Sequence, residues 1–302
     1  MPGKVSRKNG AVQAQAKGMF DAFFNATCAG VVYKRYMTLR RVTQFSEKPS
    51  FPLWQRAALF SLAYFLCASA GSYLSVSSTY VSFWLPAGLF VGVLLLNRTS
   101  EWPVLCLAAL PANLAFDYYH DPKRNLMVML LFYLANLVSS VAGAWLVRRL
   151  VAERPRLCTV GEFFGLVGFG GVLSPMLGAA IGAGTLVEFG ASQSFVASWI
   201  VWWGSCTMAV LVFSPLLLIL CGSREKLPTR FLMIGRTVEA LLLYSGLAGF
   251  TWYLLAHGGG INSPKAPLLV FVLWAGLRFD LRGGVLAVFL LAVWSAFLTT
   301  HY

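Results

Sequence analysis

Few polar side chains interrupt the long apolar segments of this 302-residue chain, and they are the residues that could do chemistry. Asn113 and Asp117 stand four residues apart, which places them on one face of a helix, and Asn136 lies in the next apolar segment. A polar group inside a membrane helix costs free energy unless it faces a cavity or a partner. These three residues therefore predict a polar pocket between helices, near one end of the bundle.

Aromatic residues could supply the walls of such a pocket. Trp199, Trp202 and Trp203 stand at i, i+3 and i+4 of one segment, and Trp84 lies in another. Tryptophans near the end of a membrane helix form an interfacial belt or a pocket wall, and both interpretations stay open. We predict an outward-facing cavity for a small, partly apolar ligand; the alternative is ordinary packing in a helix bundle. The predicted ligand-binding residues are Trp84, Asn113, Asp117, Asn136, Trp199, Trp202 and Trp203.

Other kinds of chemistry have little support in the sequence. The three histidines, His120, His257 and His301, lie at outer segment ends and far apart, and no HExxH motif or Walker loop is present. The six cysteines form no CxxC pair, which is typical of small core residues. We therefore expect no catalytic residues, no metal and no cofactor. An intramembrane enzyme would need a nucleophile and a base, or a metal set, in one layer of the bilayer.

The composition indicates which elements must position the pocket. Hydrophobic residues make up 58% of the chain and charged residues 12%, and the mean hydropathy is +0.70. These values predict an all-α, polytopic bundle of transmembrane helices with the lipid bilayer as its surroundings. About eight or nine membrane segments are expected, at 57–76, 79–97, 103–119, 125–147, 161–186, 195–221, 236–256, 266–279 and 283–300. The eighth reaches only about 21 Å at 1.5 Å per residue, so it is either a short span or a re-entrant half-helix.

Basic residues predict the orientation. With a cytoplasmic amino terminus, all but three of the 24 Lys and Arg residues fall on the cytoplasmic side, and the exceptions are Lys123, Arg124 and Lys265. The net charge of +13 thus reflects topology and does not predict nucleic-acid binding, because the charges are spread over alternate loops. Residues 1–55 are expected to form a basic cytoplasmic arm, either disordered or with an interfacial amphipathic helix, and residues 56–302 the membrane module. The expected cytoplasmic anchors are Arg148, Arg149, Arg278 and Arg282.

Proline and glycine predict where helices bend and where they pack. A proline inside a helix removes a backbone hydrogen bond, and a glycine lets the helix yield. The expected bend residues are Pro86, Gly88, Pro111, Pro175 and Pro215. Small residues that recur every four positions line one face for close helix contact, or for pairing with a second copy in a homodimer. That face consists of Gly170, Ser174, Gly178 and Gly182.

Five motifs follow one another in the order of a known family. They are FWLPAG (83–88), WPVLCLAALPANLAFD (102–117), YLANLVSSVAGAWLVRRL (133–150), SWIVWWGSCTMAVLVFSPLLL (198–218) and WAGLRFDLRGG (274–284). In this order the chain resembles the MASE family of the first type, the membrane-associated sensor domains of bacterial signalling proteins. The family positions carried by this chain are Trp84, Pro86, Gly88, Asn136, Arg149, Trp203, Pro215 and Arg278. Where the family often has an aspartate after the second tryptophan, this chain has Cys206.

The resemblance implies a sensory module in the bacterial inner membrane. Such a module controls a cytoplasmic output, a cyclic di-GMP enzyme or a histidine kinase, which is either fused beyond residue 302 or a separate partner protein. Two alternatives remain open. A transporter would use broken helices near the middle of the membrane, and a scaffold would dock a partner through the basic arm.

Overall fold

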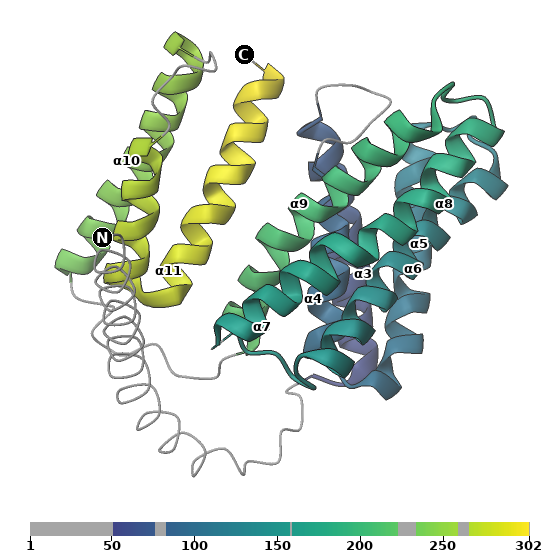
Figure 1. Cartoon of the computed structure of the whole chain (residues 1–302), viewed down its shortest axis with the longest axis horizontal. Coiled ribbons are helices and arrows are strands. Elements are labelled where there is room, and N and C mark those ends of the chain that lie inside the picture. The colour runs from purple at the N-terminus through teal and green to yellow at the C-terminus, as the bar shows by residue number, and fades with distance from the viewer. Residues whose placement is uncertain (1–50, 76–82, 158, 223–233, 259–265, 302) are drawn as a thin grey trace, which may run out of the picture. The chain divides into compact units, whose positions relative to one another are not determined.

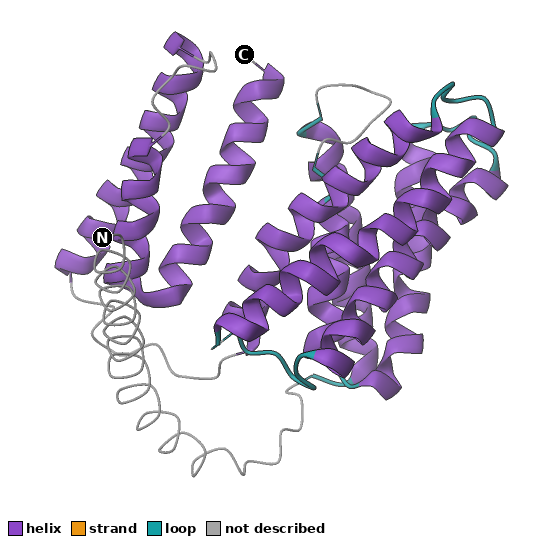
Figure 2. Ribbon diagram, viewed as in Figure 1, coloured by secondary structure: helices purple, strands orange, loops and turns teal. Residues whose placement is uncertain are grey.

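The structure is a computed structural model that describes residues 51–75, 83–157, 159–222, 234–258 and 266–301. By its contacts the chain divides into Met1–Pro52 and Leu53–Tyr302, and the fold described here is that of the second unit. Every regular element in the described residues is helical (Figures 1 and 2). The predicted all-α class is confirmed for this part of the chain. The expected basic arm, 1–55, lies almost wholly outside the described residues.

The described residues form the following helices. Their bounds are α3 (Leu53–Tyr73), α4 (Leu85–Leu96), the 3₁₀ turn η2 (Thr99–Glu101), α5 (Trp102–His120), α6 (Leu126–Leu150), α7 (Val160–Gly165), η3 (Leu166–Leu173), α8 (Ser174–Glu188), α9 (Phe195–Gly222), α10 (Ile234–Gly258) and α11 (Ala266–His301). The segments α7, η3 and α8 follow one another without a loop, and η3 is π-helical.

Local sequence explains where several helices begin. The Asn125 side chain accepts the backbone N–H of Met127 at 2.8 Å and caps α6, and the Thr159 hydroxyl accepts from Glu162 at 3.2 Å and caps α7. Pro86 stands in the first turn of α4, where its missing N–H costs nothing. Pro86 thus begins a helix, although the sequence predicted a bend inside one continuous segment over 79–97.

Five helices of the described part are long and apolar enough to cross a membrane: Leu126–Leu150, Val160–Glu188, Phe195–Cys221, Gly235–Ala256 and Pro267–His301. The predicted count of eight or nine segments is therefore not confirmed. The helix α4 has only 12 residues, about 18 Å at 1.5 Å per residue. Both α3 and α5 carry polar residues, Arg56 and Asp117 among them, that lower their hydropathy. The last candidate span, in addition, contains two predicted segments.

A break inside α11 separates those two segments. Phe279 and Asp280 have non-helical backbone angles, and Asp280 has φ 58°. Before the break, Arg278 bonds Glu239 of α10 and the Phe271 ring lies 6.2 Å from Phe250, so α11 runs antiparallel to α10. After the break, the Tyr244 hydroxyl bonds the Gly283 carbonyl and the Trp294 indole bonds the Ala248 carbonyl at 2.9 Å. The first half of α11 is thus antiparallel to α10 and the second half is parallel to it, so the chain reverses at the break. This agrees with the separate segments predicted at 266–279 and 283–300.

The helix α4 lies in the middle of the main core. Ten of its twelve residues are buried, and it packs against α3, α6 and α9. A Cβ placed on Gly88 would lie 2.2 Å from the Ala209 carbonyl oxygen, so only glycine permits this approach of α4 to α9. The Ser214 hydroxyl of α9 also donates to the Gly88 carbonyl at 2.8 Å. Gly88 therefore serves close packing, whereas the sequence predicted flexibility.

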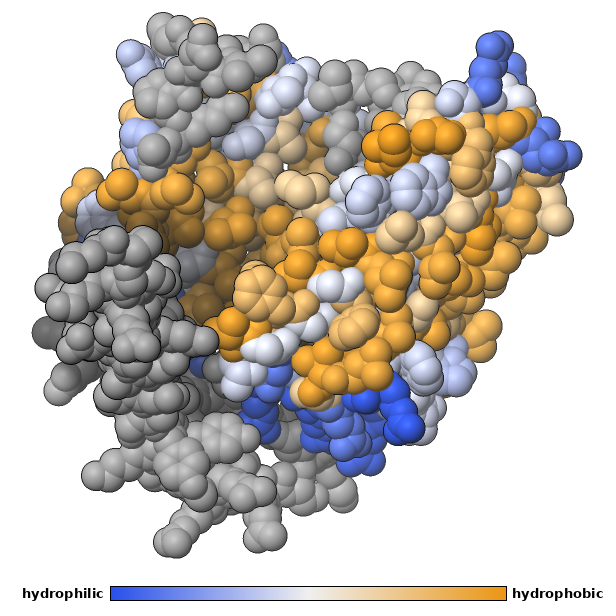
Figure 3. Space-filling view, in the orientation of Figure 1, coloured by the Kyte–Doolittle hydropathy of each residue, from blue (hydrophilic) through white to orange (hydrophobic). Residues whose placement is uncertain are grey.

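The outer surface is apolar, as a bilayer requires. Leu59, Leu62 and Leu66 follow a helical spacing on α3 and are each 57% exposed. On the face drawn in Figure 3, hydrophobic residues cover much of the helix surface and hydrophilic residues gather near helix ends. A soluble monomer rarely exposes so large an apolar surface, so this chain is a multi-pass membrane protein.

Candidate functional site

A cavity of about 550 Å³ lies where α5, α6, α8 and α9 meet near the α5–α6 turn. We name it the α5–α6 cavity. Its lining combines aromatic rings, three charged residues and three asparagines. The lining residues are Trp84, Asn113, Phe116, Asp117, His120, Asp121, Arg124, Asn125, Val128, Phe132, Asn136, Leu186, Phe189, Ala191, Val201, Trp202, Ser205 and Cys206.

One face of α5 forms the polar side of this cavity. Asn113, Phe116, Asp117 and His120 stand at i, i+3, i+4 and i+7, so one helical stripe presents all four. The helix ends at His120, and the tight turn that follows leads into α6 at Leu126. This turn brings residues of both helix ends to the same edge of the cavity.

Four side chains from three helices form a buried hydrogen-bonded network. The Tyr64 hydroxyl of α3 donates to Asn113 Oδ1 at 2.9 Å, and Asn136 Nδ2 of α6 donates to the same oxygen at 3.2 Å. Asn113 Nδ2 in turn donates to Asp117 Oδ2 at 2.7 Å. Asn113 is 1% exposed and Asp117 4%. Each of these four side chains thus has a hydrogen-bond partner, as a low-dielectric interior requires.

Arg124 closes the network at the α5–α6 turn. Its Nη1 lies 2.8 Å from Asp117 Oδ1, and its Nε lies 3.6 Å from Asp121 Oδ2. The guanidinium also stands 5.4 Å from the centre of the Phe132 ring, within cation–π range. Asp117 is thereby held from both sides, by Asn113 within the bundle and by Arg124 at its edge.

Aromatic rings line the cavity beside this network. The Trp84 ring lies 5.5 Å from Phe116, which stacks on His120 at 5.6 Å, and Phe132 lies 5.2 Å from Trp202. The Trp84 backbone N–H donates to Ser205 Oγ at 2.9 Å, which fixes the start of α4 against α9. In the described part of the chain, the buried Trp84 indole N–H has no hydrogen-bond partner.

Five of the seven predicted ligand-binding residues line this cavity: Trp84, Asn113, Asp117, Asn136 and Trp202. Trp199 and Trp203 do not. They stack on each other at 5.3 Å, and their indole N–H groups donate to the carbonyls of Met176 at 3.1 Å and Val172 at 3.0 Å. These two tryptophans bind α9 to the segment around η3, which is a structural role.

The backbone of η3 is irregular. The Ser174 N–H donates to the Phe169 carbonyl, five residues back. In the same five-residue pattern the next donor would be Pro175, which has no N–H, so the Gly170 carbonyl receives no backbone hydrogen bond. The Ser174 hydroxyl donates to that carbonyl at 2.9 Å. Pro111 and Pro215, in contrast, lie inside the regular helices α5 and α9.

The small residues of η3 and α8 lie against neighbouring helices. A Cβ on Gly178 would stand 2.5 Å from the Ala135 carbonyl oxygen of α6, and one on Gly182 would stand 2.7 Å from the Trp202 ring. Within the described unit this face, which also includes Gly170 and Ser174, is thus occupied by α6 and α9. It leaves little room there for a second copy of the chain.

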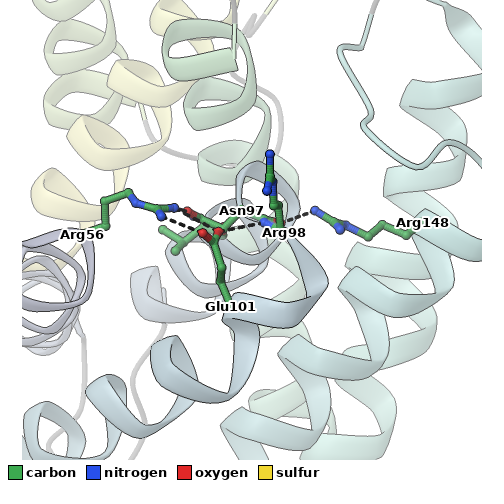
Figure 4. Close-up of polar contacts among 6 residues, drawn as sticks. Arg56, Asn97, Arg98, Glu101 and Arg148 are labelled. Atoms are coloured by element: carbon green, nitrogen blue, oxygen red, sulfur yellow. Dashed lines mark hydrogen bonds and ion pairs between the residues drawn. The ribbon is translucent and has the colours of Figure 1, made fainter. Parts of the chain in front are cut away.

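A second polar cluster lies at the far end of α4 (Figure 4). Arg56 of α3 forms an ion pair with Glu101 at 2.7 Å and also bonds the Asn97 side chain. Arg148 of α6 donates to the carbonyls of Leu95 at 3.0 Å and Asn97, which are among the last carbonyls of α4 and its C-cap. We name these contacts the arginine clamp.

The other predicted anchors differ in their surroundings. Arg149 is exposed at the end of α6. Arg278 donates to both carboxylate oxygens of Glu239, at 2.6 and 2.7 Å, and Arg282 lines a smaller cavity described below. Within the described ranges, no group of three or more His, Cys, Asp or Glu side chains is placed to hold a metal ion.

The sequence interpretation missed several lining residues. Phe116 and His120 follow the same helical stripe as Asn113 and Asp117, so the period alone could have found them. Arg124 was visible as one of three exceptions to the positive-inside pattern, and such an exception indicates a local partner. Ser205 and Tyr64 carry no such signal, because their roles depend on which helices meet.

The comparisons with known proteins give one match. A family model, MASE1, matches residues 55–302, which is most of the chain and all but the first two residues of the helical unit. The resemblance drawn from the five motifs is therefore confirmed. No curated protein and no solved structure matches the chain.

Proposed function

Because the chain belongs to the MASE1 family, whose members are membrane sensor domains of signalling proteins, we propose that it senses a small, partly apolar ligand in the α5–α6 cavity. The proposed output is a cytoplasmic cyclic di-GMP enzyme or histidine kinase, fused beyond residue 302 or separate. The proposed location is the bacterial inner membrane with a cytoplasmic amino terminus, which follows from the distribution of basic residues. MASE1 domains are input domains, and the catalytic step belongs to the output.

The observation that carries this proposal is the chemistry of the cavity. Its volume of about 550 Å³ lies within the roughly 300–1,000 Å³ of small-molecule sites. Aromatic walls offer apolar burial, while Asp117, Arg124 and Asn136 offer a few convergent polar groups that would orient a ligand. A ligand with one acceptor would also satisfy the buried indole N–H of Trp84.

The same helices connect the cavity to the arginine clamp. α4 carries Trp84 just before its first residue and Asn97 just after its last, and α6 carries Asn136 in the cavity and Arg148 in the clamp. A ligand that shifts Trp84 relative to Asn136 would therefore change the hydrogen-bond distances in the arginine clamp at the other end of α4 and α6. Such coupling requires that the ligand bind one arrangement of these helices better than another.

A cavity-blocking variant tests the proposal. Val201→Trp fills the α5–α6 cavity, and Val196→Trp places the same side chain on an exposed position of the same helix, 62% exposed in the native chain. Protein purified in nanodiscs would be extracted and its small molecules compared by mass spectrometry. We expect a molecule that is enriched with the native chain and Val196→Trp and lost with Val201→Trp.

Three outcomes would count against ligand sensing. The absence of any enriched molecule in the native sample is one, and equal retention by Val201→Trp is another. Accumulation of the enriched molecule inside sealed proteoliposomes would instead support transport. If a molecule is retained, adding it to cells should change cyclic di-GMP or kinase output with the native chain and not with Val201→Trp.

A further inference from the structure

A second cavity lies between the end of α9, the start of α10 and the break in α11. Its volume is about 290 Å³, and no residue of the α5–α6 cavity lines it. The lining residues are Leu220, Arg236, Thr237, Ala240, Tyr244, Phe279, Arg282, Gly283 and Leu286. We name it the arginine cavity, since Arg236 and Arg282 are the charged residues of its described lining.

The break in α11 creates this cavity. Phe279 is 6% exposed and packs into the small core shared by α10 and α11, so it fixes the turn in place. A Cβ on Gly283 would lie 2.4 Å from the Phe279 Cβ and 2.7 Å from the Ala275 carbonyl oxygen, so this tight reversal requires glycine. The Tyr244 hydroxyl donates to the Gly283 carbonyl at 3.3 Å and holds α10 against the turn.

The charge in this region is unevenly distributed. Glu239, the nearest acidic residue of α10, accepts two hydrogen bonds from Arg278 and one from the Trp274 indole, and it does not line the cavity. Among the described residues that line the cavity, those other than Arg236 and Arg282 are neutral, and Arg236 also donates to the Arg278 carbonyl at 3.4 Å. An anion at this position would therefore meet two half-buried guanidinium groups.

The walls beside the arginines are apolar. Leu220 and Leu286 line the cavity, and Leu220 is 48% exposed. Leu281, just after the break, is 51% exposed. A ligand that combines an anionic head with a long apolar chain matches this arrangement, because arginine binds phosphate in a bidentate geometry and leucine packs against an acyl chain.

We propose that the arginine cavity binds the phosphate headgroup of an anionic phospholipid, with Arg236 and Arg282 at the phosphate and the acyl chains along Leu220 and Leu286. In the orientation proposed above, the cavity faces the cytoplasmic leaflet, where basic pockets between helices meet anionic lipid headgroups. The proposal concerns a site separate from the α5–α6 cavity, so it stands whether or not that cavity binds a ligand.

The experiment compares thermal unfolding of the detergent-solubilised full chain with added phosphatidylglycerol, phosphatidylcholine or inorganic phosphate. We expect phosphatidylglycerol to raise the midpoint most, and the double variant Arg236→Gln/Arg282→Gln to need at least about tenfold more of it, as removing a charge-assisted hydrogen bond implies. Arg149→Gln, which removes one exposed arginine outside the cavity, is the control and should respond like the native chain.

A second variant guards against misfolding of the double variant. Ala240→Trp fills the arginine cavity and keeps both arginines, and it should also lose the response to phosphatidylglycerol. An unchanged response in Ala240→Trp and in the arginine variant would overturn the proposal. An equal response to inorganic phosphate, lost in the same variants, would also overturn it, because the site would then recognise free phosphate and not lipid.

Discussion

The buried network around Asn113 allows a quantitative prediction. Asn113→Leu removes the acceptor of the Tyr64 hydroxyl and of Asn136, and it removes the donor to Asp117. Interhelical hydrogen bonds in membranes contribute about 0.6 kcal/mol on average, and a buried group left without a partner costs about 1–3 kcal/mol. We therefore expect a loss of roughly 2–4 kcal/mol in the free energy of unfolding.

Tyr64→Phe provides the comparison, because it removes one of these bonds and leaves the Asn113 oxygen with its bond from Asn136. The expected loss is about 1 kcal/mol. In the double variant the Tyr64 hydroxyl is already absent, so its loss should be smaller than the sum of the two by about 1 kcal/mol. Ser245→Ala, at an exposed hydroxyl of α10 that bonds its own helix, should change little.

The assay is unfolding of purified protein in mixed micelles with increasing sodium dodecyl sulfate, followed by tryptophan fluorescence and extrapolated linearly to zero denaturant. Two results would refute the reasoning. One is an Asn113→Leu variant no less stable than Tyr64→Phe. The other is full additivity in the double variant, which would mean that the two side chains do not share a bond in solution.

Three further predictions concern other parts of the bundle. Gly88→Ala should lower the free energy of unfolding by more than about 2 kcal/mol, because the new Cβ meets the α9 backbone. Gly184→Ala, whose new Cβ has nothing within 4 Å, should raise it by up to about 1 kcal/mol in the same assay. Equal effects would contradict the packing role of Gly88. Asp280→Gly should raise the free energy of unfolding by about 1 kcal/mol, because φ 58° with ψ −165° is a region that only glycine adopts without strain, and a loss would show that the side chain holds the turn. The hydrogen bonds from Arg56 hold the pKa of Glu101 below its ordinary value. This pair therefore stabilises the fold at pH values above the unfolded pKa of about 4.3, and the contribution is lost as the pH falls through the lower folded pKa. Glu101→Gln should flatten the dependence of unfolding free energy on pH below about 4.3, and an unchanged slope would count against the pair.

Residue spacing predicted the polar half of the α5–α6 cavity. Asn113 and Asp117 share a face because of the helical period, and a buried polar face needs a partner, so a pocket could be inferred from one segment. The spacing could not decide among Trp199, Trp202 and Trp203, which point in different directions from one helix. Two of them instead bond carbonyls of the segment around η3, and the position of that segment beside α9 depends on helix packing that hydropathy does not reveal.

The predicted count of eight or nine membrane segments is not confirmed for a related reason. Hydropathy treats each apolar run as exposed to lipid, yet α4 is enclosed by other helices and needs no full membrane length. Pro86 was interpreted as a bend because the run was assumed to be continuous across it. The break at Phe279–Asp280, in contrast, was predicted as a boundary between segments, since Arg278 and Arg282 interrupt the apolar run there.

The enclosure of α4 has a consequence for how the protein is made. Gly88 is covered by Ala209, and the bond from Ser214 to its carbonyl spans 126 residues of chain. At a synthesis rate of roughly 5–20 residues per second, about 6–25 seconds pass between the synthesis of Gly88 in α4 and that of Ser214 in α9. During that interval a 12-residue helix, too short to cross the bilayer, must be sheltered by α3, by the insertion machinery or by distorted lipid. Assembly of the bundle thus depends on the time between two helices as well as on their fit.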